Sequence, residues 1–197
     1  MSSAPYGSLE TRRRILQATW QLIEERGSAM SLGDVAERAE VSRQAIYLHF
    51  KDRAGLLIAL VRYMDEVLAV EELAAPVFEA PTAEEALRRL MHLHSVLMPK
   101  IDSVARVLEA AQDQGEALAA AWRDRMANRK QAHLAIVRRN AEEGRLSEGW
   151  TVEAAADLLD TLTKPGPWRE LIQESGWTAD QYEDRITQLL GASLLRQ

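Results

Sequence analysis

The stretch from Ser31 to Phe50, SLGDVAERAEVSRQAIYLHF, constrains the fold of this chain more than any other. Ser31 followed three residues later by Asp34 predicts a capping box, in which the hydroxyl and the carboxylate satisfy backbone N–H groups at a helix start. Apolar positions then recur at helical spacing, at Val35 and Ala39 among others. The stretch therefore predicts a short helix that begins just after Ser31.

A second helix follows almost at once. Ser42 is a good N-cap residue, and Ile46 with Phe50, four residues later, supplies a buried face. Only residues 40–42 separate the two helices. A turn of this length between two short helices is typical of a helix-turn-helix.

The second helix carries polar side chains away from its apolar face. Arg43 and Gln44 at its start are residue types that make bidentate contacts to purine edges in a major groove. Tyr47 and His49 can donate to phosphates, which sets the register without reading sequence. The alternative interpretation is an ordinary solvated helix face.

The region from about Thr11 to Leu57 resembles the DNA-binding domain of the tetracycline-repressor (TetR) family of bacterial transcriptional regulators. One residue departs from the family pattern, because Glu40 stands where the family usually has Gly in the turn. A non-Gly residue with positive φ costs about 1 kcal/mol. Gly33 inside the first short helix is a second oddity of similar cost. The matching residues are Ile15, Leu16, Ala18, Leu22, Ile23, Gly27, Ser31, Asp34, Val35, Ala36, Ala39, Val41, Ser42, Tyr47, His49, Phe50, Arg53, Leu56 and Leu57.

The resemblance implies a homodimer that binds a palindromic operator in double-stranded DNA and responds to a small-molecule effector. In such a dimer the last two long helices form the interface, and an effector shifts the spacing of the two recognition helices, which must enter major grooves about 34 Å apart. We expect DNA contacts from Arg12, Arg13, Ser31, Ser42, Arg43, Gln44, Tyr47, His49, Lys51 and Arg53.

The charge distribution along the chain is consistent with a DNA-binding domain followed by a domain with another role. The net charge is −6, but the chain through Arg62 holds nine Lys and Arg against seven Asp and Glu, and the remainder holds fifteen against twenty-three. A mildly basic head on an acidic body fits a small DNA-binding domain joined to a larger one. Arg12, Arg13 and Arg14 open a helix predicted to begin near Thr11. Because they oppose its dipole, they suggest a phosphate partner, although a solvated basic end is the alternative.

Helical periodicity continues to the end of the chain and predicts an all-α fold. We expect a helix-turn-helix DNA-binding domain over residues 9–54 and a helical effector-binding and dimerisation domain over residues 55–197. Further helices are expected over residues 53–73, 82–98, 100–112, 116–143, 151–163, 168–174 and 178–195, with Pro99 separating two of them.

The helix over residues 116–143 contains the candidate effector site. Arg129 and His133 interrupt an otherwise apolar face, and buried polar groups need partners. Either these side chains reach solvent or pair with acids, or the face lines a small-molecule cavity between helices. The candidate residues are His94, Trp122, Met126, Arg129 and His133.

Several classes of function are disfavoured. The chain has no Cys, so thiol catalysis, disulfides and Cys-bound zinc are excluded. No catalytic motif is present, His92 and His94 are poorly spaced for a shared metal ion, and we predict no enzyme, cofactor or metal site. With no apolar run long enough to span a bilayer, we expect a cytoplasmic protein. The competing hypothesis is a helix-turn-helix module without an effector, acting through protein partners or on the nucleoid.

Overall fold

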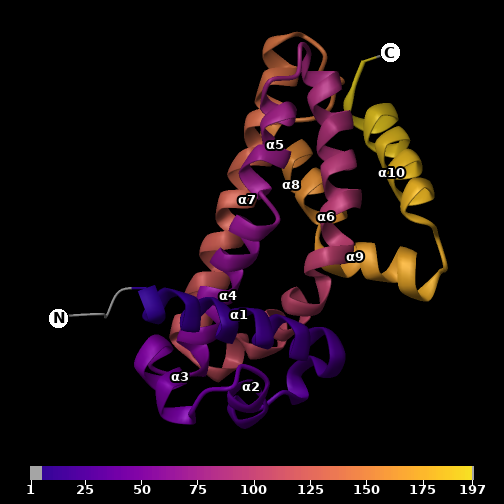
Figure 1. The fold of residues 1–197 in the computed structure, drawn as a ribbon. Coiled ribbons are helices and arrows are strands. Elements are labelled where there is room, and N and C mark those ends of the chain that lie inside the picture. The colour runs from indigo at the N-terminus through magenta and orange to yellow at the C-terminus, as the bar shows by residue number, and fades with distance from the viewer. Residues whose placement is uncertain (1–5, 197) are drawn as a thin grey trace. The chain divides into compact units, whose positions relative to one another are not determined.

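The computed structural model describes residues 6–196, without the side chains of residues 6–8 and 114. Within that range every regular element is a helix, apart from an isolated bridge between Leu146 and Leu195, so the all-α prediction is confirmed. None of these helices has the length and apolarity needed to cross a membrane. The α-helices, coloured along the chain in Figure 1, are α1 (Tyr6–Arg26), α2 (Leu32–Arg38), α3 (Arg43–Phe50), α4 (Arg53–Val67), α5 (Val70–Phe78), α6 (Ala83–Ala111), α7 (Glu116–Glu142), α8 (Val152–Leu162), α9 (Pro165–Arg169) and α10 (Ala179–Leu194).

The chain forms two compact units. The first contains the chain up to Ala69 together with Ile101–Arg123, and the second contains Val70–Lys100 and the chain from Asp124 onward. Helices α6 and α7 therefore each contribute residues to both units.

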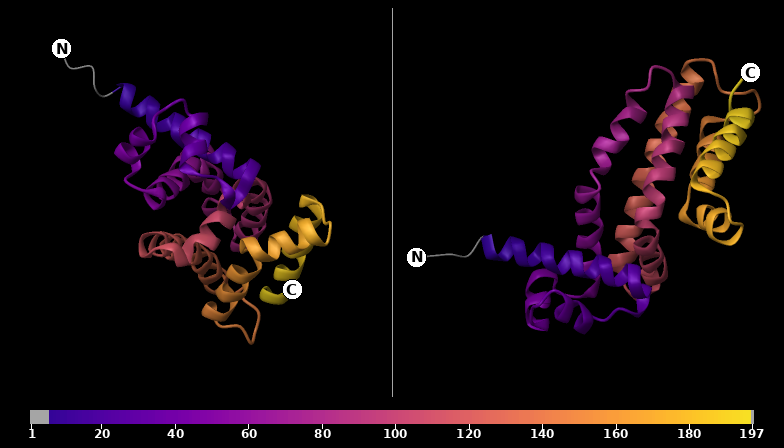
Figure 2. Two further views of the ribbon diagram at one scale, coloured as in Figure 1. Left: turned by 90° about the horizontal axis from the view of Figure 1, so that it is seen from below. Right: turned by 45° about the vertical axis from the view of Figure 1, so that its right-hand side comes forward.

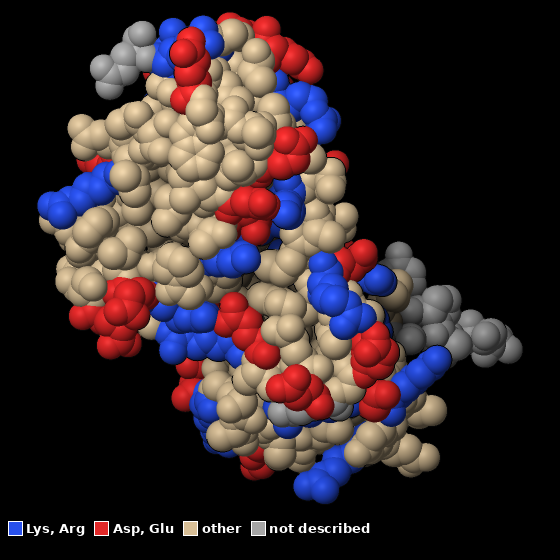
Figure 3. All heavy atoms as spheres, turned by 180° about the vertical axis from the view of Figure 1, so that it is seen from behind, with Lys and Arg blue, Asp and Glu red and all other residues tan. Residues whose placement is uncertain are grey.

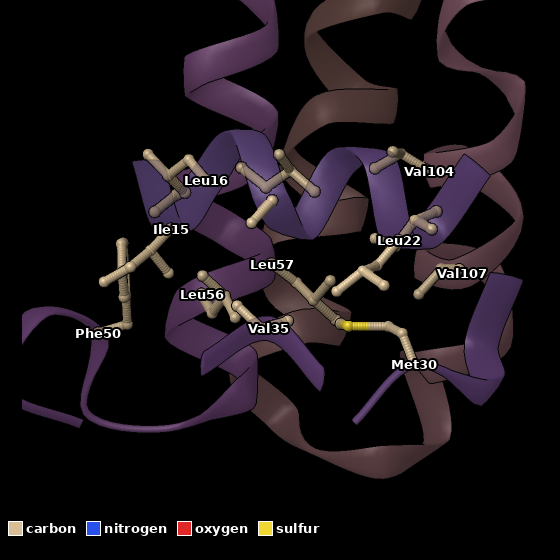
Figure 4. Close-up of a cluster of buried hydrophobic side chains, with 14 of the residues drawn as sticks. Ile15, Leu16, Leu22, Met30, Val35, Phe50, Leu56, Leu57, Val104 and Val107 are labelled. Carbon is tan, nitrogen blue, oxygen red and sulfur yellow. The ribbon is translucent and has the colours of Figure 1, made fainter. Parts of the chain in front are cut away.

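The first unit is built around a core that the short helices could not form alone. Ile15, Val35, Leu56 and Leu57 are fully buried, and side chains of α6 complete the cluster, as Figure 4 shows. Burying a side chain of this size contributes about 1.5–3 kcal/mol. Helix α1 packs against α2 and α4, and α3 packs against α2 and α4 (Figures 1 and 2). This packing holds the helix-turn-helix in place.

The second unit holds α8, α9 and α10 together. Leu159 of α8 and Tyr182 and Leu190 of α10 are fully buried. Glu183 links α10 to α6, because its carboxylate accepts from the Ser95 hydroxyl at 2.6 Å and lies 3.1 Å from His92 Nδ1. The buried side chains of α8 and α10 therefore form a core within this unit, and the polar contacts of Glu183 connect α6 to it.

Most predicted helix starts are confirmed, and two predicted ends are wrong. Thr82, Thr151 and Thr178 each accept a backbone N–H at the start of a helix, as expected. Pro99, however, lies inside α6. A proline in a helix costs about 3 kcal/mol or more, but apolar residues on both sides of it, such as Met98 and Val104, are buried and offset that cost.

The second wrong boundary concerns α4. This helix was expected to reach Leu73, but it ends at Val67. Ala69 then has φ of 49°, a left-handed conformation that a continuous helix cannot contain, and α5 begins at Val70.

Candidate functional site

The first helix of the predicted helix-turn-helix begins with the expected capping box. The Ser31 hydroxyl accepts from the Asp34 N–H at 3.2 Å, and the Asp34 carboxylate accepts from the Ser31 N–H at 2.8 Å. The Ser31 hydroxyl donates to the Asp34 carboxylate at 2.6 Å, and this hydrogen bond, together with the one from the Ser31 N–H and with Arg26 nearby, holds the pKa of Asp34 below its ordinary value. Arg26 also pairs with Asp34 at 3.1 Å, and this ion pair connects α1 to the start of α2.

The turn after α2 has the geometry that the sequence predicted. Glu40 has φ of 54°. Its N–H donates to the Glu37 carbonyl at 3.1 Å, and the Val41 N–H donates to the Ala36 carbonyl at 2.9 Å. This pair of hydrogen bonds is the Schellman motif, whose left-handed position is usually occupied by Gly. Glu40 therefore occupies a conformation that is strained for its residue type.

Helix α3 presents one apolar and one polar face, as expected. The Ser42 hydroxyl accepts from the Ala45 N–H at 3.1 Å and caps the helix. Ile46 and Phe50 are buried. The opposite face, which lies in solvent, consists of Arg43, Gln44, Tyr47 and Leu48, with His49 half-buried beside it. Sequence reasoning missed Leu48, although its spacing of four residues from Gln44 placed it on the same face.

Gly33 explains how Arg43 is accommodated. A Cβ at position 33 would lie within 2.4 Å of Arg43 Nη2 and 3.1 Å of its Cζ. The guanidinium of Arg43 therefore rests on the first turn of α2, and a side chain at position 33 would require this guanidinium to shift. The second oddity of the sequence thus has a structural reason, because Gly33 allows close contact between α2 and the first residue of α3.

Arg12 holds the C-terminal end of α3. Its Nη1 donates to the His49 carbonyl at 3.1 Å, and its guanidinium lies 4.5 Å from the Phe50 ring centroid. The expectation that Arg12 and its neighbours open α1 is wrong, because the helix begins at Tyr6. The dipole argument for a phosphate partner therefore fails, although Arg13 and Arg14 remain exposed.

Arg53 and Lys51 lie just beyond α3. Arg53 Nη2 donates to the Ser28 carbonyl at 3.2 Å, so this side chain ties the start of α4 to the segment after α1. Lys51 is exposed and has φ of 65°. Asp52 caps α4 by accepting from the Gly55 N–H at 2.7 Å. On the face drawn in Figure 3, Lys and Arg side chains are interspersed with Asp and Glu, in keeping with the net charge of −6.

The second unit contains a buried polar cluster around Asp160 of α8. Arg129 Nη1 donates to Asp160 Oδ1 at 2.7 Å, and Arg129 Nη2 donates to the Thr163 hydroxyl at 2.7 Å. His133 Nδ1 lies 3.2 Å from the same Asp160 oxygen. Of the two alternatives left open by the sequence, an internal acid is therefore the partner of Arg129 and His133.

His94 of α6 joins this cluster from another side. Its Nε2 lies 2.5 Å from the Thr163 carbonyl oxygen, and its ring stacks on Tyr182 with centroids 5.6 Å apart. Burial lowers the pKa of His94 to about 3, against the opposing effect of the Thr163 hydrogen bond, and Arg129 and His133 lower it further. Burial, followed by the positive charge of Arg129, also lowers the pKa of His133. Both rings are therefore neutral at pH 7.

The structure thus brings together three of the five candidate effector residues. His94, Arg129 and His133 meet around Asp160 and Thr163. Trp122 instead packs against the core of the first unit, and Met126 is half-buried on α7. Sequence reasoning missed Asp160, although it stands four residues after buried Ala156 and so on the inner face of α8. Within residues 6–196 no group of three His, Asp or Glu side chains is arranged to hold a metal ion.

Comparison with known proteins agrees with this geometry. The family described as bacterial regulatory proteins of the tetR family matches residues 15–60, from α1 into α4. The chain is 32% identical to the HTH-type transcriptional regulator AcrR of Shigella flexneri over 102 residues, which is 43% of this chain and 47% of that protein. It is 31% identical to the nucleoid occlusion factor SlmA of Vibrio campbellii over 106 residues, 52% of this chain and 54% of that protein. Each match thus spans about half of the relative's length.

The likeness in fold extends further along the chain. The crystal structure of a transcriptional regulator from Saccharomonospora viridis in complex with choline superposes with a TM-score of 0.82 at 21% identity, covering 95% of this chain and 99% of that one. The capped helix-turn-helix, the family match over the same residues and the shared all-helical fold agree. Residues 15–60 therefore match the tetR family of bacterial regulatory proteins, and the chain shares the fold of the solved regulator.

Proposed function

We propose that this protein is a homodimeric transcriptional repressor that binds a palindromic operator through α3 and is released by a small molecule. The observation that carries the proposal is the exposed polar face of α3, held by the Ser31 and Ser42 caps in a helix-turn-helix. A helix of this kind enters the major groove with its N-terminal residues against the base edges. Such a regulator would act in the cytoplasm, where bacterial DNA lies.

The contacts divide between base reading and positioning. Arg43 and Gln44, at the exposed start of α3, suit purine edges. Tyr47, Lys51 and Arg13 are also exposed and suit phosphates. The exposed hydroxyls of Ser31 and Ser42 and the half-buried His49 complete the proposed contact set. Arg12 and Arg53 donate to backbone carbonyls of the protein, so their main contribution is to position α3 and α4.

The proposed dimer forms through α8 and α10, within an effector-binding and dimerisation domain of residues 55–197 that follows the DNA-binding domain of residues 9–54. Leu189 of α10 is 53% exposed, although neighbouring Leu190 is fully buried. The polar and small residues on the same exposed side of α10 include Arg185 and Ala192. Covering Leu189 in an interface would remove an apolar side chain from water.

The effector site is proposed at the polar cluster of the second unit, with His94, Met126, Arg129 and His133. Arg129 is the residue that favours this site, because an anionic group on a mainly apolar molecule could replace Asp160 as the partner of its guanidinium. The regulator from Saccharomonospora viridis, which shares this fold, was crystallised in complex with choline. That complex supports small-molecule binding by the fold, and it does not indicate which ligand this protein binds. Trp122 packs against the core of the first unit, so it is not part of the proposed site.

The direct test is selection of sites from random duplex DNA, followed by titration at several salt concentrations. We expect one palindromic site, bound by a dimer in analytical ultracentrifugation, with affinity that falls as salt rises. Arg43→Ala and Gln44→Ala should each cost about 1–3 kcal/mol and relax preference at one or two base pairs. Tyr47→Phe should weaken all sites nearly alike. A protein that selects no sequence, or a tyrosine variant that changes base preference while Arg43→Ala does not, would contradict the assignment.

A second candidate function is favoured by one comparison. The match to the nucleoid occlusion factor SlmA covers 52% of this chain, and that protein is named for an action on the nucleoid. A helix-turn-helix module of this class would act without an effector, through protein partners or at many sites. Release from DNA by a small molecule, screened with amphipathic anions on the selected site, separates the two functions, since only the proposed repressor should respond.

A further inference from the structure

Leu48 is the most exposed large apolar side chain in the described part of the chain, with 80% of its surface in solvent. It lies near the end of α3, opposite the buried Ile46 and Phe50. No core or helix–helix contact accounts for it. Single exposed leucines are common on protein surfaces, so exposure alone assigns no role; the position of Leu48 on α3 is what matters.

The neighbours of Leu48 on this face are the residues proposed to meet DNA. Gln44 precedes it by four residues, and side chains at this spacing lie side by side on a helix, about 5–6 Å apart at Cβ. Tyr47, directly before it, is 51% exposed. Leu48 therefore belongs to the face that enters the major groove in the proposed function.

The major groove offers one apolar group to such a side chain. Base edges there present hydrogen-bond donors and acceptors, together with the C5 methyl group of thymine. We propose that Leu48 is a specificity-determining residue that reads a thymine methyl group in the operator. The inference rests on the proposed function and adds an apolar contact to the polar contacts of Arg43 and Gln44.

The geometry of α3 limits where this thymine lies. Successive base pairs are about 3.4 Å apart along the duplex, and the Cβ atoms of Gln44 and Leu48 are about 5–6 Å apart, which is less than two such steps. The thymine should thus lie within about two base pairs of the base that Gln44 contacts. It should occur once in each half-site, because a dimer places one α3 in each.

The fold also holds the helix backbone that carries Leu48. The next residue, His49, has its carbonyl bound by Arg12 Nη1 at 3.1 Å, and Phe50 is buried beneath the Arg12 guanidinium. At its other end α3 is capped by Ser42. Because α3 is held at both ends, its backbone loses little further freedom on binding, which favours discrimination by a single methyl contact.

The experiment replaces each thymine of the selected site by deoxyuridine, which differs from thymidine only by the missing C5 methyl group. Full-length wild-type protein should bind about tenfold more weakly when the thymine read by Leu48 is replaced, equivalent to about 1.4 kcal/mol. Leu48→Ala should bind the thymine and uracil sites equally, and Leu48→Met should keep the discrimination. Leu73→Ala in α5 is the matched control, because it makes the same change at a 38% exposed leucine of the other unit.

The outcomes separate this inference from the proposed function. Specific binding without any thymine–uracil difference would overturn the role of Leu48 and leave the regulator intact, and so would a difference that persists in Leu48→Ala. Failure of the wild type to select any site would overturn both. Because Leu48 is exposed, Leu48→Ala should keep the wild-type unfolding temperature, which excludes misfolding as the cause of a changed preference.

Discussion

Glu40 has a strained backbone conformation within an otherwise well-packed domain. Its φ of 54° places it in the left-handed region, where an L side chain meets its own backbone. The Schellman hydrogen bonds on either side keep the turn closed. Because α2 and α3 both pack into the core through this turn, the strain is offset by burial elsewhere.

Replacing Glu40 by Gly should raise the free energy of unfolding by about 1 kcal/mol, because glycine adopts positive φ without steric cost. Urea unfolding followed by circular dichroism measures the change. Glu37→Gly is the matched control, since Glu37 is exposed inside α2 and the same substitution there should lower stability by about 1 kcal/mol. A Glu40→Gly protein less stable than wild type would show that the side chain makes a compensating contact.

At the scale of elements, the placement of α3 depends on α1 as much as on its own sequence. Arg12 reaches from α1 to a terminal carbonyl of α3, where a positive charge also complements the helix dipole. Two ion pairs, Arg26–Asp34 and Arg38–Glu25, fasten α1 to α2 in addition. Helix α3 is thus held from three sides: by its cap, by the core and by α1.

Arg12→Ala should therefore lower the free energy of unfolding by about 1–2 kcal/mol, through loss of a charged hydrogen bond and a cation–π contact. It should also weaken binding to all DNA sequences alike. Arg13→Ala is the control, since Arg13 is exposed and its loss should change stability by less than about 0.5 kcal/mol. Thermal unfolding and DNA titration of both variants give the comparison. Equal stability of the two variants would refute a positioning role for Arg12.

At the scale of the whole molecule, the polar cluster joins four helices of the second unit. Asp160 of α8 receives Arg129 and His133 from α7, while His94 of α6 meets Thr163 and the ring of Tyr182 from α10. Breaking a buried ion pair by removing one partner costs about 3–5 kcal/mol. The packing of these helices therefore depends on the ion pair between Arg129 and Asp160.

The stability of the protein should consequently depend on pH in a window set by the two buried histidines. Their pKa values are lowered in the folded chain, that of His94 to about 3, whereas an unfolded histidine has its ordinary pKa of 6.5. Below pH 6.5 the unfolded chain binds protons that the folded chain does not. Stability should be fully present above that pH and fall as pH drops towards 5, by about 1 kcal/mol per pH unit for each residue.

Urea unfolding between pH 7.5 and 5.0 tests this dependence in a range where unperturbed carboxylates stay ionised. The decline should be shallower in His94→Gln and His133→Gln. It should persist in His92→Gln, because His92 is exposed and lies outside the cluster. A wild-type protein whose stability is level across this range would contradict the burial of neutral histidines.

The sequence alone determined the features that depend on contacts within about four residues. Capping at Ser31, Ser42 and Thr178 and the buried face of α3 follow from spacing and residue type, whereas the left-handed turn at Glu40 was expected from the resemblance to the TetR family. These interactions form inside a single helix or turn, so a linear pattern is enough to reveal them. The helix-turn-helix and the all-α fold were predictable for that reason.

Tertiary structure decided the features that join distant segments. The Arg12 bond to His49 spans 37 residues and the Arg129 bond to Asp160 spans 31, and no local pattern indicates either. Likewise α6 continues through Pro99, because burial on both sides outweighs a local penalty. The partner of a charged side chain depends on which distant segment packs beside it. The net cost of a proline in a helix likewise depends on how much apolar surface other segments bury around it. Those terms exist only once the chain has folded.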